Sequence, residues 1–128
     1  MSEDPSALFG RVCDAKGVLL QVAERRAGAN AAELSLTCDV GRVSVKADPA
    51  TRRIVVSVLD GDGIPRGLQD AAEEDPWWRV LGAPLAAVDA SGAGESLRLQ
   101  FRELSENPRF ITLEVQGAAL RVGCQGPT

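Results

Sequence analysis

The fold is decided by one stretch of the sequence, Leu34-Ser35-Leu36-Thr37-Cys38-Asp39-Val40-Gly41-Arg42-Val43-Ser44-Val45-Lys46-Ala47. Apolar side chains alternate with polar ones on both sides of Val40-Gly41. A period of two places one face of a strand in the core and the other in water. We therefore predict two antiparallel strands joined by a tight turn at Val40-Gly41.

A third strand follows this hairpin along the chain. Asp48-Pro49-Ala50-Thr51 forms a turn in which proline presets the backbone, and the run Arg52–Leu59 comes next. Its segment Ile54–Leu59 is apolar on both faces and rich in β-branched residues, which is typical of a central strand. The chain from Ala32 to Leu59 is thus predicted to form a three-stranded antiparallel meander.

The second half of the chain contains four further runs that are candidate strands, so a second meander is expected. These runs are Leu85–Val88, Leu97–Phe101, Ile111–Val115 and the residues around Leu120 and Val122. Before the first hairpin, residues 18–24 are predicted to be a strand and Arg25–Asn30 a loop. Residues 5–16 fit either a capped helix or a strand.

Together these elements predict an α+β fold that is mostly β. Antiparallel meander sheets are expected to form a sandwich or a half-barrel with one or two short helices. The 128 residues suffice for a single domain with its own core. Within this domain, 1–128, we expect a disordered tail over 1–7, an acidic surface loop over 60–75 and a second tail over 124–128.

The composition excludes the commonest catalytic machinery. The chain has no histidine, so Ser-His-Asp and Cys-His catalysis and His-based zinc or haem sites cannot be built within it. Its formal net charge of -4 argues against a nucleic acid or an anionic membrane as partner. We therefore expect no cofactor and no metal, and assign no catalytic residue.

The three cysteines indicate a reducing compartment. Cys13, Cys38 and Cys124 lie far apart, form no C-x-x-C pair and each adjoin an apolar stretch. We interpret them as reduced, largely buried thiols of a cytoplasmic protein. The acidic N-terminus does not resemble a signal peptide, and no apolar run approaches the ~20 residues of a membrane helix, so a soluble chain is expected.

The segment Asp75-Pro76-Trp77-Trp78-Arg79-Val80-Leu81-Gly82 predicts a short helix. Asp75 would cap it, Pro76 would be its first residue and Gly82 would follow its end. Adjacent helical residues point about 100° apart, so Trp77 and Trp78 cannot both face the core. One of them is expected to be buried and the other to be partly exposed, where it could contact a partner or ligand.

Arginine supplies most of the positive charge, with only two lysines in the chain. If Arg98 and Arg102 share the outer face of a strand, with Gln100 between them, that face could contact a carboxylate-rich partner. The alternative is that these are solubilising surface positions. The candidate interface residues are Asp75, Trp77, Trp78, Arg79, Arg98 and Arg102.

Two sets of acidic residues could carry a function other than a protein interface. The residues Asp60 and Asp62 and the acids that follow them could hold a divalent cation, but position twelve of a calcium loop starting at Asp60 is Ala71 instead of Glu. A solvated acidic turn explains the pattern better. Glu95, Glu103 or Glu114 could support carboxylate-based catalysis. A simpler interpretation is that they lie on the solvent-facing side of a strand or at a strand end.

The chain from Asp75 to Cys124 carries a set of short motifs. They are Trp77 or Trp78, Gly82-Ala83-Pro84-Leu85, Gly92 to Gly94, Leu97–Phe101, Ile111–Val115 and Leu120-Arg121-Val122. In these motifs the segment resembles the C-terminal half of a bacterial family of small uncharacterised proteins, and the acidic turn at Asp60-Gly61-Asp62 is similar to one in the same family. The chain departs from that family at Ala86-Ala87-Val88, where aromatic residues are usual. The resemblance implies no activity.

The sequence therefore favours a non-enzymatic, cytoplasmic bacterial binding module. Its interface would lie around the Trp77-Trp78 helix and the acidic loop before it, and the partner would be another protein or a second copy of the chain. An immunity-type or mobile-DNA accessory protein would suit such a domain by analogy. The alternative is a small-molecule binder or carboxylate-based enzyme that uses the interior of a half-barrel.

Overall fold

The computed structural model describes residues 4–59, 64–71, 73–74, 76–91 and 94–125 of the chain. The described part is mostly β, as predicted, with nine strands, one α-helix and two 3-10 turns. The elements are α1 (Pro5–Asp14), β1 (Leu19–Ala27), β2 (Asn30–Cys38), β3 (Gly41–Asp48), β4 (Arg53–Leu59), β5 (Gln69–Asp70), η1 (Trp77–Arg79), β6 (Leu85–Ser91), β7 (Ser96–Phe101), η2 (Leu104–Glu106), β8 (Arg109–Gln116) and β9 (Ala119–Gln125).

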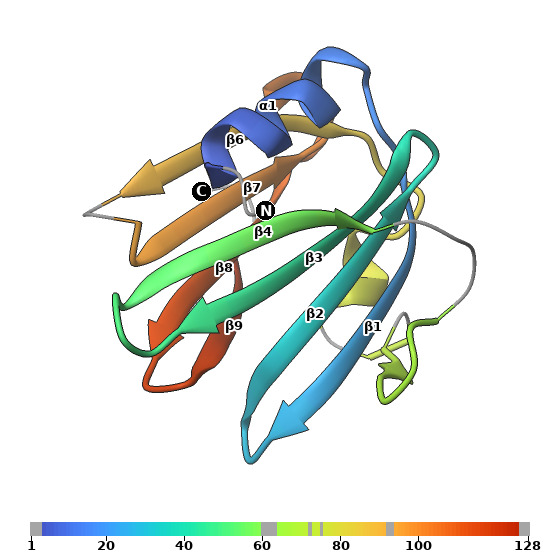
Figure 1. Ribbon diagram of the computed structural model, residues 1–128. Coiled ribbons are helices and arrows are strands. Elements are labelled where there is room, and N and C mark those ends of the chain that lie inside the picture. Colours follow the sequence, from blue (N-terminus) through green and yellow to red (C-terminus); the bar gives the residue numbers. More distant parts are fainter. Residues whose placement is uncertain (1–3, 60–63, 72, 75, 92–93, 126–128) are drawn as a thin grey trace.

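Both predicted meanders are present. Strands β2, β3 and β4 pair consecutively and antiparallel, and β1 adds a fourth strand on the other side of β2. Strands β6, β7, β8 and β9 form the second meander. Figure 1 shows the two meanders as two curved layers, with β1 to β4 in front of β7, β8 and β9.

One residue of β2 joins the two meanders. Ala31 pairs with Arg26 of β1 on one side and with Leu120 of β9 on the other. The strand order is therefore β4-β3-β2-β9-β8-β7-β6. The start of β1 also approaches the start of β6, where the N–H of Leu19 donates to the carbonyl of Ala83 (3.1 Å). The sheet is thus curled into a half-barrel.

The N-terminal segment, left open by the sequence, forms the helix α1. Asp4 caps it, because its Oδ2 accepts a hydrogen bond from the N–H of Ala7 (3.2 Å). Leu8, Phe9 and Val12 are buried on one face of the helix. This face packs against β6 and β4, so α1 covers the space between the two ends of the strand order (Figure 1).

Alternation correctly predicts which side chains form the core. In β7 the residues Leu97, Leu99 and Phe101 are buried, and the first two pair with the buried residues Leu113 and Ile111 of β8. The front layer contributes the same pattern. The largest fully buried side chains are Trp77, Phe9, Phe101, Leu19, Leu34, Leu36, Leu97, Leu99, Ile111, Leu113, Leu120 and Val22.

The prediction that β4 is a central strand is wrong. It stands at the end of the strand order, and Val58 near its C-terminal end is 55% exposed. The outer edge of β4 is nevertheless partly covered. The N–H of Ile54 donates to the carbonyl of Gly94 (2.8 Å), and α1 packs against the same strand. An edge strand covered in this way can carry as much apolar surface as a central one.

The predicted loop over Arg25–Asn30 is also wrong, since β1 continues to Ala27 and only two residues form the turn. Both Arg25 and Arg26 of this extension lie close to an acidic side chain. Arg25 lies 3.7 Å from Glu33 and Arg26 lies 3.0 Å from Glu24. Gly28, with φ of 65°, supplies the left-handed turn residue.

The structure also bears on the expected tails and loop. The helix α1 covers residues 5–7 of the N-terminal segment, and β9 includes Cys124 and Gln125. Within the expected acidic loop, β5 pairs with β1, where Ala23 is opposite Asp70 and Glu24 is opposite Gln69. Asp60 and Asp62 lie outside the described residues.

Candidate interaction site

The segment around Trp77 is a tight 3-10 turn, shorter than the predicted helix. The N–H of Trp78 donates to the carbonyl of Glu74 (3.1 Å), and the N–H groups of Val80 and Leu81 both donate to Trp77 (3.0 and 3.1 Å). Pro76 is the residue before the turn, and it makes no side-chain cap. The predicted capping residue, Asp75, lies outside the described residues.

Gly82 ends the turn and fastens it to the sheet. Its φ of 79° is accessible to glycine at little cost, and its N–H donates to the carbonyl of Leu19 in β1 (2.7 Å). The N–H of Leu19 in turn donates to Ala83. The end of the turn is therefore held to Leu19 of β1 by two backbone hydrogen bonds.

The two tryptophans lie in opposite environments, which confirms the predicted division. Trp77 is 1% exposed and belongs to the core, whereas Trp78 is 53% exposed. The guanidinium of Arg79 lies 4.6 Å from the centroid of the Trp78 ring, a cation–π contact. Trp78 and Arg79 thus form one stacked, solvent-facing unit.

A buried carboxylate lies beside this turn. Glu24 is 5% exposed and accepts a hydrogen bond from Nη1 of Arg26 (3.0 Å). Burial raises the pKa of Glu24, Arg26 opposes this, and the carboxylate of Glu74 raises the pKa further. Sequence analysis missed Glu24, although its register with Val22 on an alternating strand places a charge on the inward face.

Arg98 and Arg102 do not share a face of β7. Arg98 lies within the strand, on the face opposite Leu97 and Leu99. Arg102 follows the last strand residue with a φ of 72°, so the alternation ends before it. The side chain of Gln100 is turned to the backbone, because its Nε2 donates to the carbonyl of Arg102 (2.9 Å).

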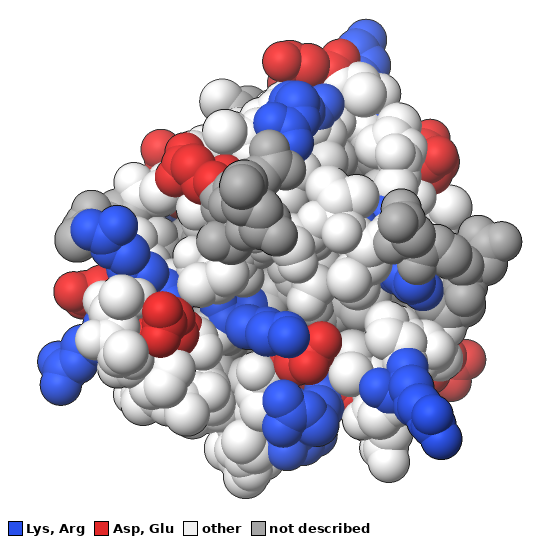
Figure 2. Space-filling model, viewed as in Figure 1, with Lys and Arg blue, Asp and Glu red and all other residues white. Residues whose placement is uncertain are grey.

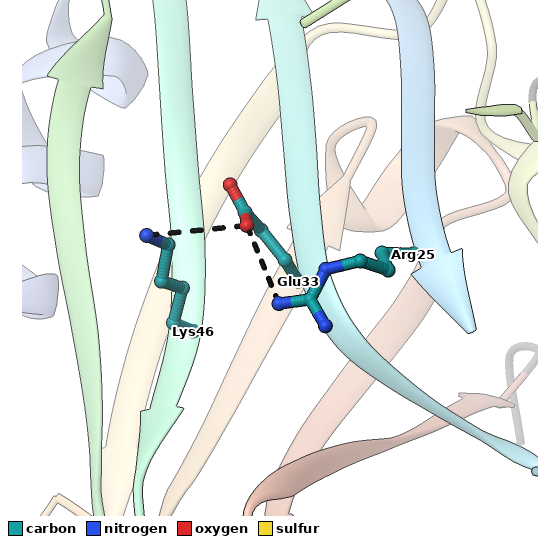
Figure 3. Close-up of polar contacts among 3 residues, drawn as sticks. All are labelled: Arg25, Glu33 and Lys46. Atoms are coloured by element: carbon teal, nitrogen blue, oxygen red, sulfur yellow. Dashed lines mark ion pairs between the residues drawn. The ribbon is translucent and has the colours of Figure 1, made fainter. Parts of the chain in front are cut away.

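The outer face of the front layer carries a small ion-pair network (Figure 3). Glu33 of β2 lies 3.7 Å from Arg25 of β1 and 3.9 Å from Lys46 of β3. Both cations are about half exposed, so solvent screens the pairs. Charges of both signs are interspersed over this face (Figure 2). Arg25 and Lys46 are thus solvent-facing charges on this layer.

The cysteines are free thiols, and burial raises the pKa of two of them. Burial raises the pKa of Cys38 to about 11, with Asp39 adding to the effect, and burial also raises the pKa of Cys13. Cys124 is half-buried in β9. Among the described residues, no group of three His, Cys, Asp or Glu side chains is placed to hold a metal ion.

The carboxylates offered for catalysis are distributed over separate surface positions. Glu95 lines a depression of about 380 Å³ with Arg52 and Gln116, and its carbonyl accepts from the N–H of Val115 (2.9 Å). Glu114 is half-buried on β8, opposite Ser96 and Arg121. Glu103 is exposed just before η2.

The helices in the described part of the chain are too short or too polar to cross a bilayer. Comparisons with protein-family profiles, with curated proteins and with solved structures find no match.

Proposed function

We propose that this chain is a non-enzymatic protein-binding module whose contact surface is the Trp78 face, defined as Trp78, Arg79 and the acidic residues Glu73 and Glu74. The observation that carries the proposal is the half-exposed indole of Trp78, stacked under Arg79. Large aromatic side chains held in one orientation are typical anchors of interfaces, because little conformational entropy is lost when they dock.

The charge around the indole indicates the kind of partner. Asp70, Glu73 and Glu74 are exposed and precede the turn, and the chain as a whole has a net charge of -4. A protein with an apolar pocket for Trp78 and a basic rim would complement this surface. Arg79 balances part of the negative charge and keeps the indole ring in place.

The interior of the half-barrel favours this proposal over an internal active site. Inward positions of the strands are occupied by closely packed aliphatic side chains, among them Leu34, Leu99 and Ile111, each 0% exposed. The depressions formed by described residues open on the surface. A small-molecule or carboxylate-based enzyme would instead use a polar internal cavity.

The setting that we propose is the bacterial cytoplasm, with an immunity-type or mobile-DNA accessory role by analogy. Three free, at least half-buried thiols suit a reducing compartment. A second copy of the chain is the other candidate partner, and light scattering after gel filtration separates the two. A monomer at micromolar concentration would leave a different protein as the partner.

Site-specific photo-crosslinking in cells tests the Trp78 face. A photoreactive amino acid at Glu73, an exposed residue of the Trp78 face whose replacement leaves the indole in place, is compared with the same amino acid at Val58, which is exposed at the end of β4. We expect a cross-linked protein from position 73 alone, competed by added wild-type chain and not by Trp78→Ala. If Trp78→Ala competes as well as wild type, the proposal is wrong.

A further inference from the structure

Four side-chain positions form a row across the outer face of the second meander. Asp89 of β6 is opposite Arg98 of β7, Arg98 is opposite Thr112 of β8, and Thr112 is opposite Gly123 of β9. A depression of about 420 Å³ lies over this row and is lined by Asp89, Ala90, Ser96, Arg98, Thr112 and Gln125. We call it the Arg98 depression.

The depression exists partly because β9 has a glycine at position 123. A Cβ atom there would lie only 2.8 Å from Oγ1 of Thr112, so any other residue would displace the threonine side chain. The φ of Gly123 is not in the left-handed region, so the backbone does not require glycine at this position. What requires it is the close approach of the Thr112 hydroxyl.

Arg98 is held in position without using its hydrogen-bond donors. Its guanidinium lies 4.7 Å from the centroid of the Phe110 ring. Its nearest acid is Asp89 at 4.0 Å, which is too long for a hydrogen bond, and the Asp89 side chain is 80% exposed. Within the described part of the chain, the guanidinium N–H groups of Arg98 make no hydrogen bond. The side chain remains 49% exposed.

We propose that the Arg98 depression binds the carboxylate group of a small-molecule ligand. A guanidinium fixed against an aromatic ring offers two parallel N–H donors, which match the two oxygens of a carboxylate. The hydroxyls of Ser96 and Thr112 and the amide of Gln125 line the same depression and supply further donors. This site is independent of the Trp78 face.

The charge of the site favours a carboxylate over a phosphate. Asp89 lines the depression within 4.0 Å of the guanidinium, so a dianion would be repelled at one side of the site. A monoanion carrying a hydrogen-bond donor or a cationic group could contact both residues. The depression is also within the roughly 300–1,000 Å³ range of small-ligand sites.

The test is an NMR titration of the full chain with acetate and, separately, with inorganic phosphate at constant ionic strength. The variants are Arg98→Gln, Arg98→Lys and Gly123→Ala. The matched control is Arg121→Gln, which removes an exposed arginine from β9 of the same meander. Backbone signal dispersion shows that each variant is folded.

We expect saturable acetate shifts at Ser96, Arg98, Thr112 and Gln125, with a roughly millimolar Kd because a lone carboxylate makes few contacts. Arg98→Gln should abolish them, Arg98→Lys should weaken binding about tenfold by losing the planar fork, and Arg121→Gln should leave binding unchanged. Gly123→Ala should weaken binding by displacing Thr112. Unsaturable shifts, equal losses in Arg98→Gln and Arg121→Gln, or tighter binding of phosphate than of acetate would each overturn the proposal.

Discussion

Trp77 and Trp78 are neighbours in the chain, yet Trp77 is 1% exposed and Trp78 is 53% exposed. The 3-10 turn that carries them directs one ring into the core and the other into solvent. The N–H of Trp78 donates to the carbonyl of Glu74, and the N–H of Gly82 donates to the carbonyl of Leu19 in β1, so the turn has a fixed orientation. The difference between the two rings is thus a property of the fold, and it predicts different consequences for their removal.

Trp77→Ala should destabilise the protein by about 3–5 kcal/mol, because it leaves a cavity the size of an indole in the core. Trp78→Ala should cost less than about 1 kcal/mol, most of it from the lost contact with Arg79. Urea unfolding of the two variants measures the difference. Equal losses of unfolding free energy would contradict the assignment.

The intrinsic fluorescence of single-tryptophan variants gives a second prediction. In Trp78→Phe the remaining indole is buried, and its emission should be blue-shifted and poorly quenched by acrylamide. In Trp77→Phe the remaining indole is exposed and should be quenched readily. Similar quenching constants in the two folded variants would show that the rings are not divided in this way.

Alanine substitutions at Gly17 and Gly10 are predicted to change the stability in opposite directions. A Cβ atom at Gly17 would lie 2.6 Å from Cγ1 of Val12 and 3.0 Å from Cγ2 of Val40, so Gly17→Ala should separate α1 from the β2–β3 turn and destabilise the fold by roughly 1–3 kcal/mol. A Cβ at Gly10 meets nothing within 4 Å in the helix, so Gly10→Ala should stabilise by about 0.5–1 kcal/mol. Thermal unfolding of both variants checks the opposite signs.

Glu24 should make the stability depend on pH. Burial raises its folded-state pKa above the ordinary 4.5, so the folded state binds more protons than the unfolded state in this window. The free energy of unfolding should therefore fall as the pH rises from about 4.5 through the raised pKa, and then level off. Glu24→Gln should lose this fall and be at least as stable as wild type at pH 7.

Glu33→Gln is the control for that experiment, since Glu33 is a pairing acid on the outer face of the same sheet. It should retain the pH dependence that Glu24→Gln removes. Urea unfolding at several pH values provides the measurement. If Glu24→Gln is less stable than wild type at pH 7 but equal at pH 4, the ion pair with Arg26 outweighs burial.

Cys38 should resist alkylation in the folded protein. Its pKa is raised from 9.0 to about 11, so at pH 8 the reactive thiolate is about a hundredfold rarer than for an ordinary cysteine. Iodoacetamide labelling followed by mass spectrometry measures the rate for each cysteine. The same chain in urea is the reference, and equal rates for Cys38 in both conditions would contradict the prediction.

Secondary structure was largely predictable because the residue alternation that indicates a strand also creates a buried face. Leu34 and Leu36, or Leu97 and Leu99, are buried for the same reason that they alternate with polar residues. The failures have physical causes. Ile54–Leu59 is apolar although β4 is an edge strand, because α1 packs against it. Arg25 lies in β1 because the ladder between β1 and β2 continues to Ala27 opposite Asn30.

For the candidate site, the sequence predicted that one tryptophan would be buried and the other exposed, but not which. Glu24 was missed because a buried carboxylate is improbable until its partner Arg26 is known to lie beside it. The Arg98 depression was only partly foreseen. The sequence suggested carboxylate contacts for Arg98, but the neighbours Phe110, Thr112 and Gly123 come from register between strands.

The sequence by itself thus determined the two meanders, the apolar core positions and the absence of histidine chemistry, because each depends on local periodicity or on composition. Only the tertiary structure decided that Ala31 joins the two meanders, that α1 covers the edge of β4, and that Trp78 is the exposed ring. These features depend on contacts between segments far apart in the chain, which the spacing of residues along the chain does not encode.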